Sequence, residues 1–134
     1  MHPIVKKIAL LAALLALGLL AGTGAQRLRA YYAAEGGAPQ PGNYQALIDQ
    51  SAAPVVLFSS PTCPYCKLAK AFLAEHRVAY RNVDVTTAAG RQLFEQHHGS
   101  GVPLLLTARM RLQGFVEPEY RTHVLPWAAA KSAG

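Results

Sequence analysis

The sequence predicts an α/β fold: a mixed four-stranded sheet flanked by helices and preceded by an N-terminal hydrophobic helix. A wholly apolar run over residues 55–59 is typical of a strand that is covered on both faces. Two segments have apolar residues at helical spacing, and short strand-like segments alternate with them. We expect these apolar residues to face the core: Leu68, Ala69, Phe72 and Leu73 in the first segment, and Leu93 and Phe94 in the second. The predicted elements, in order, are strand 55–59, helix 64–76, strand 79–85, helix 87–98, strands 102–107 and 109–113, and helix 117–125.

The connections between these elements fix the strand directions. The first two strands must be parallel because a helix crosses between them, and the last two antiparallel because a tight hairpin joins them. A short helix that Asn43 can cap and that ends near Ser51 precedes the first strand. Pro126 is expected to end the last helix. About eighty residues can bury a small but adequate core.

The N-terminus has the pattern of a targeting segment. Lys6 and Lys7 precede residues 8–25, which carry no charge and are rich in Leu and Ala. A basic start followed by an apolar stretch is typical of a secretory signal, and eighteen uncharged residues reach the lower limit for a membrane span. We therefore assign residues 1–25 to a signal peptide or membrane anchor, residues 26–42 to a flexible linker and residues 43–134 to the globular domain.

This assignment predicts where the domain works. We expect it on the periplasmic side of a bacterial inner membrane, tethered through residues 8–25, or exported if the segment is cleaved. A cytoplasmic orientation stays open, because Arg27 and Arg29 nearly balance the lysines at positions 6 and 7.

The two cysteines of the chain, Cys63 and Cys66, stand in Cys-x-x-Cys spacing between the first strand and the following helix. In this setting the spacing is typical of a redox motif. A helix start offers unpaired N–H groups and the positive end of the helix dipole, and both stabilise an anion. We therefore expect Cys63 to be the attacking thiolate and Cys66, one turn inside the helix, to be the resolving thiol.

Two other roles for the cysteines fit the sequence less well. A structural disulfide that closes so short a loop would remove little chain entropy. A zinc site would need two more ligands, for which His76, His97 and His98 are candidates. Adjacent histidines on a helix point about 100° apart and would not easily complete one tetrahedron. We expect no metal.

The charge of the chain does not indicate a nucleic-acid partner. Thirteen Lys and Arg residues outnumber seven Asp and Glu residues, but in the domain they are scattered and lack interleaved aromatic residues. The sequence has no phosphate-binding loop, paired carboxylates or Ser/His/Asp signature. We expect a monomer with a solvated basic surface.

From Val55 to about Leu125 the sequence resembles a glutaredoxin, a family with the thioredoxin-like fold (βαβαββα). Four sets of residues carry the resemblance, in the order of the family: Cys63-Pro64-Tyr65-Cys66, Val83-Asp84-Val85, Val102-Pro103 and Gly114-Phe115. The resemblance implies a thiol–disulfide oxidoreductase without a tightly bound cofactor, which acts on protein or glutathione mixed disulfides.

The resemblance also implies a substrate site. Val102-Pro103 matches the family's cis-proline position, and Tyr65 matches the ring that flanks bound glutathione. Gly114-Phe115 matches the turn into the last helix beside the site. The implied substrate-binding residues are thus Tyr65, Val102, Pro103, Gly114 and Phe115.

Three departures from the family pattern concern glutathione. Ser60 stands where many glutathione-binding members have a lysine, and Gly101 replaces the usual threonine. Phe115-Val116-Glu117 replaces the glycine and acidic cluster that hold the glutamyl end of glutathione. Pro118-Glu119 is closer to glutaredoxin-like proteins that thioredoxin reductase reduces.

Disulfide-containing proteins are therefore the expected partners, and either glutathione or a thioredoxin-reductase-type reductant is the expected electron source. The alternative function is a binding module: a metal or iron–sulfur carrier, or a thioredoxin-like adaptor without turnover.

Overall fold

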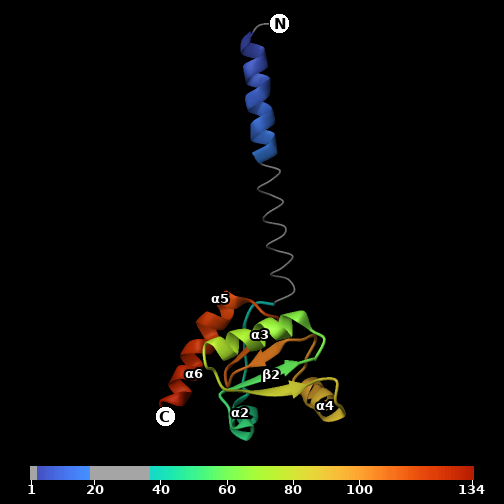
Figure 1. Cartoon of the computed structure of the whole chain (residues 1–134), viewed down its shortest axis with the longest axis vertical. Helices are drawn as coiled ribbons and strands as arrows, with labels where there is room; N and C mark the ends of the chain where they lie inside the picture. Colours follow the sequence, from blue (N-terminus) through green and yellow to red (C-terminus); the bar gives the residue numbers. More distant parts are fainter. Residues whose placement is uncertain (1–2, 19–36) are drawn as a thin grey trace. The chain divides into compact units, whose positions relative to one another are not determined.

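The computed structural model describes residues 3–18 and 37–134, and the chain divides into two compact units, Met1–Ala34 and Glu35–Gly134. In the first unit, residues 3–18 form one helix, blue in Figure 1. No helix within the described ranges combines the length and apolarity that crossing a bilayer requires. Residues 19–25 of the predicted anchor 8–25 and residues 26–36 of the predicted linker 26–42 lie outside the described residues, so both assignments remain predictions.

The second unit is built on a mixed sheet. Its strands are β1 (Gln40–Pro41), β2 (Val55–Ser59), β3 (Tyr80–Asp84), β4 (Leu104–Leu106) and β5 (Met110–Gln113), in the spatial order β1-β5-β4-β2-β3. The pair β2–β3 is parallel, and the other three pairs are antiparallel. The predicted mixed sheet is confirmed, but the sheet in the described residues has five strands rather than the predicted four.

The additional strand, β1, lies in the predicted linker. Gln40 pairs with Arg111 and Pro41 with Met110, and the N–H of Gly42 donates to the carbonyl of Arg109 at 2.9 Å. The Gly- and Pro-rich sequence around it argues against a helix or a central strand. An edge strand is compatible with proline, because one of its sides needs no hydrogen bonds.

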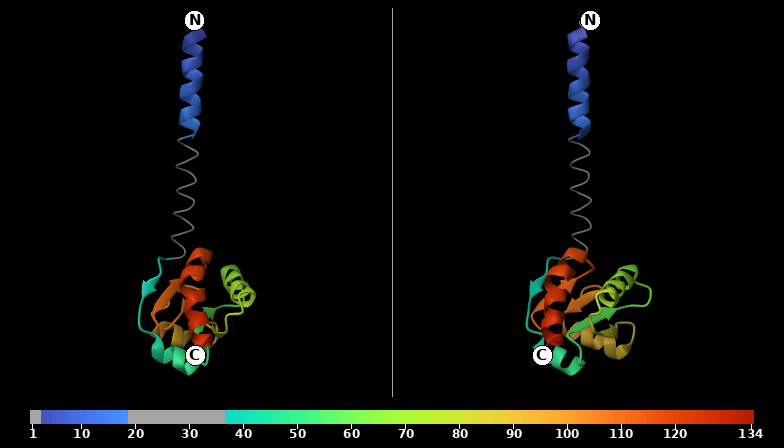
Figure 2. Two further views of the ribbon diagram at one scale, coloured as in Figure 1. Left: turned by 90° about the vertical axis from the view of Figure 1, so that its left-hand side faces the viewer. Right: turned by 60° about the vertical axis from the view of Figure 1, so that its left-hand side comes forward.

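Helices cover both faces of the sheet (Figures 1 and 2). They are α2 (Gln45–Ser51), α3 (Pro64–Glu75), α4 (Ala88–Gln96) and a C-terminal helical run of α5 (Glu117–Glu119), a π-helical turn (Tyr120–Val124) and α6 (Leu125–Ser132). Side chains of α3 and the C-terminal run pack on one face with Val55 and Leu57. Those of α2 and α4 pack on the other face with Val56 and Phe58. All five residues of β2 are buried, as the apolar run predicted.

The last helix does not end before Pro126, contrary to the prediction. The π-helical turn shifts the hydrogen-bond register, so that the N–H of Leu125 donates to the carbonyl of Tyr120, five residues back. Pro126 then lies in the first turn of α6, where its missing N–H needs no partner. The helix continues to Ser132, and the indole N–H of Trp127 donates to the carbonyl of Pro54 at 2.8 Å.

Three apolar side chains are less buried than their helical spacing predicted. Leu93 and Phe94 of α4 are half-buried. Leu68, expected on the packed face of α3, is 51% exposed. Spacing identifies one side of a helix, but the neighbouring elements decide how much of that side is covered.

Candidate active site

Cys63 is the N-cap residue of α3. Its backbone is extended (φ −79°, ψ 115°), and Pro64 follows at the first helical position, where its fixed φ is favourable. The backbone N–H of Cys66 donates to the Cys63 sulfur at 3.1 Å. One N–H group of the helix start therefore points at this sulfur, as the sequence predicted.

Cys66 lies one turn further along α3 and is 1% exposed. Burial raises the pKa of its thiol to about 11, a hydrogen bond with the Cys63 side chain adds to the rise, and the Ser60 backbone and the Lys70 charge oppose it. Both cysteines are free, and Cys63 is only partly buried. The pair is therefore asymmetric: one sulfur is accessible at the helix start, and the other is a buried neutral thiol.

The loop before β4 lies against the cysteines. The peptide bond between Val102 and Pro103 is cis, as the resemblance implies. The Cys63 thiol donates to the carbonyl oxygen of Val102 at 3.6 Å. The structure thus brings the predicted residues Cys63, Cys66, Val102 and Pro103 together.

Gly114 supports this loop from the end of β5. Its φ of 76° is in the left-handed region that favours glycine. Its N–H donates to the carbonyl of Pro103 at 2.8 Å. The preceding residue, Gln113, donates from its side-chain amide to the carbonyl of Gly101 at 2.7 Å. The Gly114-Phe115 motif marks Gly114 in the sequence, but no motif marks Gln113.

The two predicted aromatic residues have different surroundings. Tyr65 is 42% exposed on α3. Phe115 is half-buried, and its ring packs against those of Tyr120 (centroids 4.9 Å apart) and Phe72 (5.9 Å). The structure therefore places Phe115 in an aromatic cluster between α3 and the C-terminal helical run.

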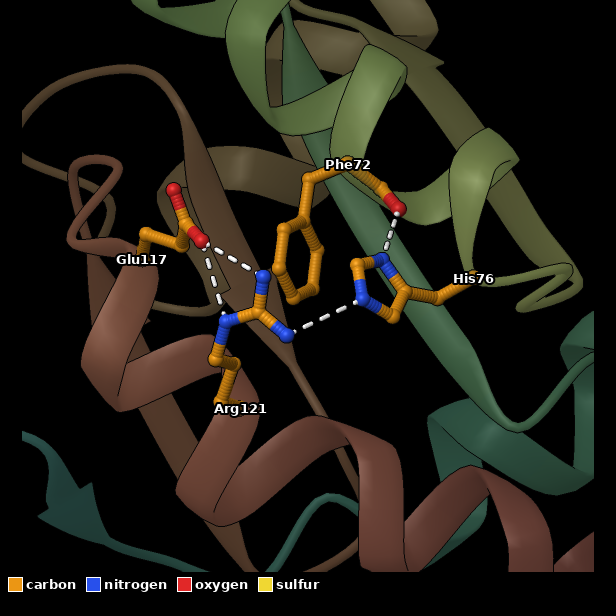
Figure 3. Close-up of polar contacts among 4 residues, drawn as sticks. All are labelled: Phe72, His76, Glu117 and Arg121. Atoms are coloured by element: carbon orange, nitrogen blue, oxygen red, sulfur yellow. Dashed lines mark hydrogen bonds and ion pairs between the residues drawn. The ribbon is translucent and has the colours of Figure 1, made fainter.

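His76, a candidate zinc ligand, has both ring nitrogens engaged (Figure 3). Nε2 lies 3.2 Å from a terminal nitrogen of Arg121, and Nδ1 lies 2.9 Å from the carbonyl oxygen of Phe72. Because arginine can only donate, Nε2 accepts, and Nδ1–H donates to Phe72. Among the described residues, no group of three or more His, Cys, Asp or Glu could hold a metal ion.

Comparison with known proteins agrees with this geometry. Residues 55–106 match the family model described as glutaredoxin. This part of the chain is glutaredoxin-like. The matched residues contain both cysteines and the cis Val102–Pro103 bond, so the glutaredoxin-like segment includes the core of the candidate site. The likeness indicates a thiol oxidoreductase.

Solved structures with TM-scores of 0.50 or more share the thioredoxin-like fold of this domain. The buckwheat glutaredoxin–glutathione complex is 22% identical, with 66% of this chain and 86% of that chain covered and a TM-score of 0.52. Glutaredoxin grx-1 from Archaeoglobus fulgidus is 24% identical, with 57% and 90% covered and a TM-score of 0.50. Reduced glutaredoxin C1 from Populus tremula x tremuloides is 30% identical, with 61% and 80% covered and a TM-score of 0.48. No curated protein matches the chain.

Proposed function

We propose that the domain is a dithiol–disulfide oxidoreductase in which Cys63 attacks the substrate and Cys66 resolves the mixed disulfide. The observation that carries this proposal is the asymmetry of the pair. The Cys63 sulfur is partly accessible and receives an N–H bond of 3.1 Å from the helix start, whereas Cys66 is buried and its thiol pKa is raised to about 11. A nucleophile and a protected second thiol are the two parts that a dithiol mechanism requires.

In the first step, the Cys63 thiolate attacks one sulfur of a substrate disulfide. A bond forms between Cys63 and that sulfur, the substrate S–S bond breaks, and the other sulfur leaves as a thiolate that takes a proton from water. The N–H of Cys66 supports the thiolate before attack because a hydrogen bond to an anion is stronger than one to a neutral group.

In the second step, Cys66 loses its proton to solvent and attacks the Cys63 sulfur. The substrate is released as a thiol, and the Cys63–Cys66 disulfide remains, so two electrons have passed from the protein to the substrate. The high pKa of Cys66 keeps this thiol from competing with Cys63 for the first attack. A thiol reductant must then return two electrons to the pair.

Disulfide-containing proteins are the proposed substrates, and glutathione and a thioredoxin-reductase-type protein are the two candidate reductants. The buckwheat structure contains glutathione, which supports glutathione as the reductant. The departures from the glutathione-binding pattern at Ser60, Gly101 and Phe115-Val116-Glu117 support a thioredoxin-reductase-type protein instead. Glu117 is one of these replacing residues, and it forms an ion pair of 2.7 Å with Arg121. Its carboxylate is therefore already paired within the domain.

The proposed activity is tested by mixing the reduced protein with bis(2-hydroxyethyl) disulfide and measuring the formation of mercaptoethanol. Two equivalents per protein are expected, together with loss of both free thiols. With Cys66→Ser, trapping from a cell extract should yield partners joined through Cys63. A reduced wild-type protein that leaves the small disulfide unchanged would refute the activity.

We further propose that residues 8–25 tether the domain to a membrane or direct its export, and that the domain works in the periplasm. The support is the sequence: Lys6 and Lys7 precede an uncharged apolar segment.

A further inference from the structure

Two large apolar side chains of the domain are exposed beside the cysteine pair. Within residues 37–134, the exposed large hydrophobic residues are Tyr65 (42% exposed) and Leu68 (51%). Both belong to α3, three positions apart, so they lie on the same side of the helix. We call this pair the α3 ridge.

The α3 ridge continues a buried aromatic cluster toward Cys63. Phe72 is four residues after Leu68 and lies on the same side of α3. Its ring packs against Phe115 and lies under the Arg121 guanidinium, which is 5.5 Å from the ring centroid (Figure 3). The packing surface of α3 is therefore covered at Phe72 and uncovered at Leu68 and Tyr65, in the two turns next to the nucleophile.

The size of the α3 ridge limits what can cover it. A stable pair of proteins needs about 800 Å² of buried surface from each partner. Two half-exposed side chains provide only a small part of that area, so the α3 ridge alone cannot hold a second copy of the chain. It has the size to contact one or two apolar side chains of a bound segment.

The charges on α3 select among such segments. Lys67 and Lys70 are the charged residues in the first two turns after Cys66, and the first acidic residue of the helix is Glu75. Helical spacing puts both lysines on the side of α3 away from the α3 ridge, so their charge acts on a docked segment across the width of the helix and is screened by salt. A segment with acidic residues is attracted to this end of α3, and a basic one is repelled.

We propose that the α3 ridge docks the disulfide-bearing segment of a polypeptide substrate, one with a large apolar residue next to the attacked cysteine and acidic residues nearby. This inference rests on the proposed function and narrows its substrate class. The covalent chemistry is unchanged: two electrons pass from the Cys63/Cys66 dithiol to the peptide disulfide, and both halves of that disulfide leave as thiols.

The test uses the reduced full-length protein, whose dithiol supplies the electrons, and three peptides that carry one cysteine as a mixed disulfide with mercaptoethanol. In the first peptide leucine precedes the cysteine and glutamates flank both. The second has serine in place of leucine, and the third has lysines in place of the glutamates. Second-order rate constants are measured in single turnovers at low salt, with bis(2-hydroxyethyl) disulfide as the reference substrate.

The first peptide is expected to react about fivefold faster than the second, which corresponds to about 1 kcal/mol. It is also expected to react faster than the third, by a factor that falls as salt is added. Leu68→Gln should reduce the leucine preference to nearly one. Its thermal unfolding should stay close to the wild type, because the position is exposed and both residues favour helix. Ala74→Gln, at an exposed position on the opposite side of α3, should keep the preference.

The docking proposal fails if wild-type protein reacts with the small disulfide but equally fast with the leucine and serine peptides. It also fails if Leu68→Gln keeps the preference, or if the wild type forms a dimer that this substitution dissociates. A wild type that does not reduce even the small disulfide would instead refute the oxidoreductase activity, and the docking proposal with it.

Discussion

The buried hydroxyl of Tyr120 donates to the carbonyl of Gly114 at 3.3 Å, which ties the C-terminal helical run to the loop beside the cysteines. The N–H of Gly114 donates to the carbonyl of Pro103, and the neighbouring Val102 carbonyl accepts from the Cys63 thiol. Three hydrogen bonds thus connect Tyr120 to the nucleophile.

Tyr120→Phe should lower the free energy of unfolding by about 1 kcal/mol, because the buried Gly114 carbonyl loses its side-chain donor. For a domain of this size, the melting temperature should fall by about 4–8 °C. Calorimetry measures both. Tyr80→Phe is the matched control, since the described structure shows no hydrogen bond from its hydroxyl. Equal losses for the two variants would contradict a specific role of the Tyr120 bond.

Substitution of the two cysteines should separate their roles. Cys63→Ser should abolish disulfide reduction, because the accessible sulfur at the helix start is lost. Cys66→Ser should still attack but should accumulate mixed disulfides. Mass spectrometry after iodoacetamide treatment at mildly acidic pH should find Cys63 alkylated first. Preferential alkylation of Cys66 would reverse the assignment.

The raised pKa of Cys66 predicts a loss of stability at alkaline pH. The folded protein holds this proton up to a pKa of about 11, whereas the ordinary value is 9.0. Between these values the unfolded chain releases the proton first, so the unfolded state gains stability as the pH rises. The contribution is fully present below pH 9 and lost through pH 11, by about 3 kcal/mol.

Cys66→Ala separates this effect from lysine and tyrosine titration. Denaturant unfolding between pH 8 and 11.5 should show a steeper decline for the wild type than for the variant. Parallel curves would show that the Cys66 thiol is not protected in the folded state.

These features differ in how far the sequence could predict them. The apolar run 55–59, the helix start at Cys63 and the cis bond before Pro103 follow from local patterns or from the family resemblance, and the structure contains all three. The bond between Tyr120 and Gly114 joins residues from different elements, and no motif marks Tyr120, so this bond needed the tertiary structure. Local propensity does not encode strand β1, which depends on a position at the edge of the sheet. It also does not encode the continuation of the helix through Pro126, which depends on a shift in the hydrogen-bond register.

Glutathione is expected to be a poor specific ligand. Ser60 supplies no positive charge at a position where many glutathione-binding glutaredoxins have a lysine. The carboxylate of Glu117 is already paired with Arg121. Rates with a glutathionylated peptide should therefore rise linearly with concentration where a standard glutaredoxin saturates. Ser60→Lys should increase the rate, and the gain should shrink with salt. Saturation of the wild type at concentrations similar to the standard would contradict this prediction.

The cellular location of the domain can be measured with a reporter fusion. Alkaline phosphatase fused after Gly134 should be active in intact bacterial cells, because it folds only where its disulfides can form and the Lys6-Lys7 start favours export of the domain behind residues 8–25. Replacing Leu14 and Leu15 by lysines should abolish this activity, since two charges interrupt the apolar segment. Replacing the same two leucines by isoleucines keeps the segment apolar and uncharged, so this matched control should leave the activity in place. An inactive phosphatase fusion together with an active cytoplasmic reporter at the same position would place the domain in the cytoplasm. The thiol reductants there would then be the glutathione and thioredoxin systems, and the periplasmic proposal would be wrong.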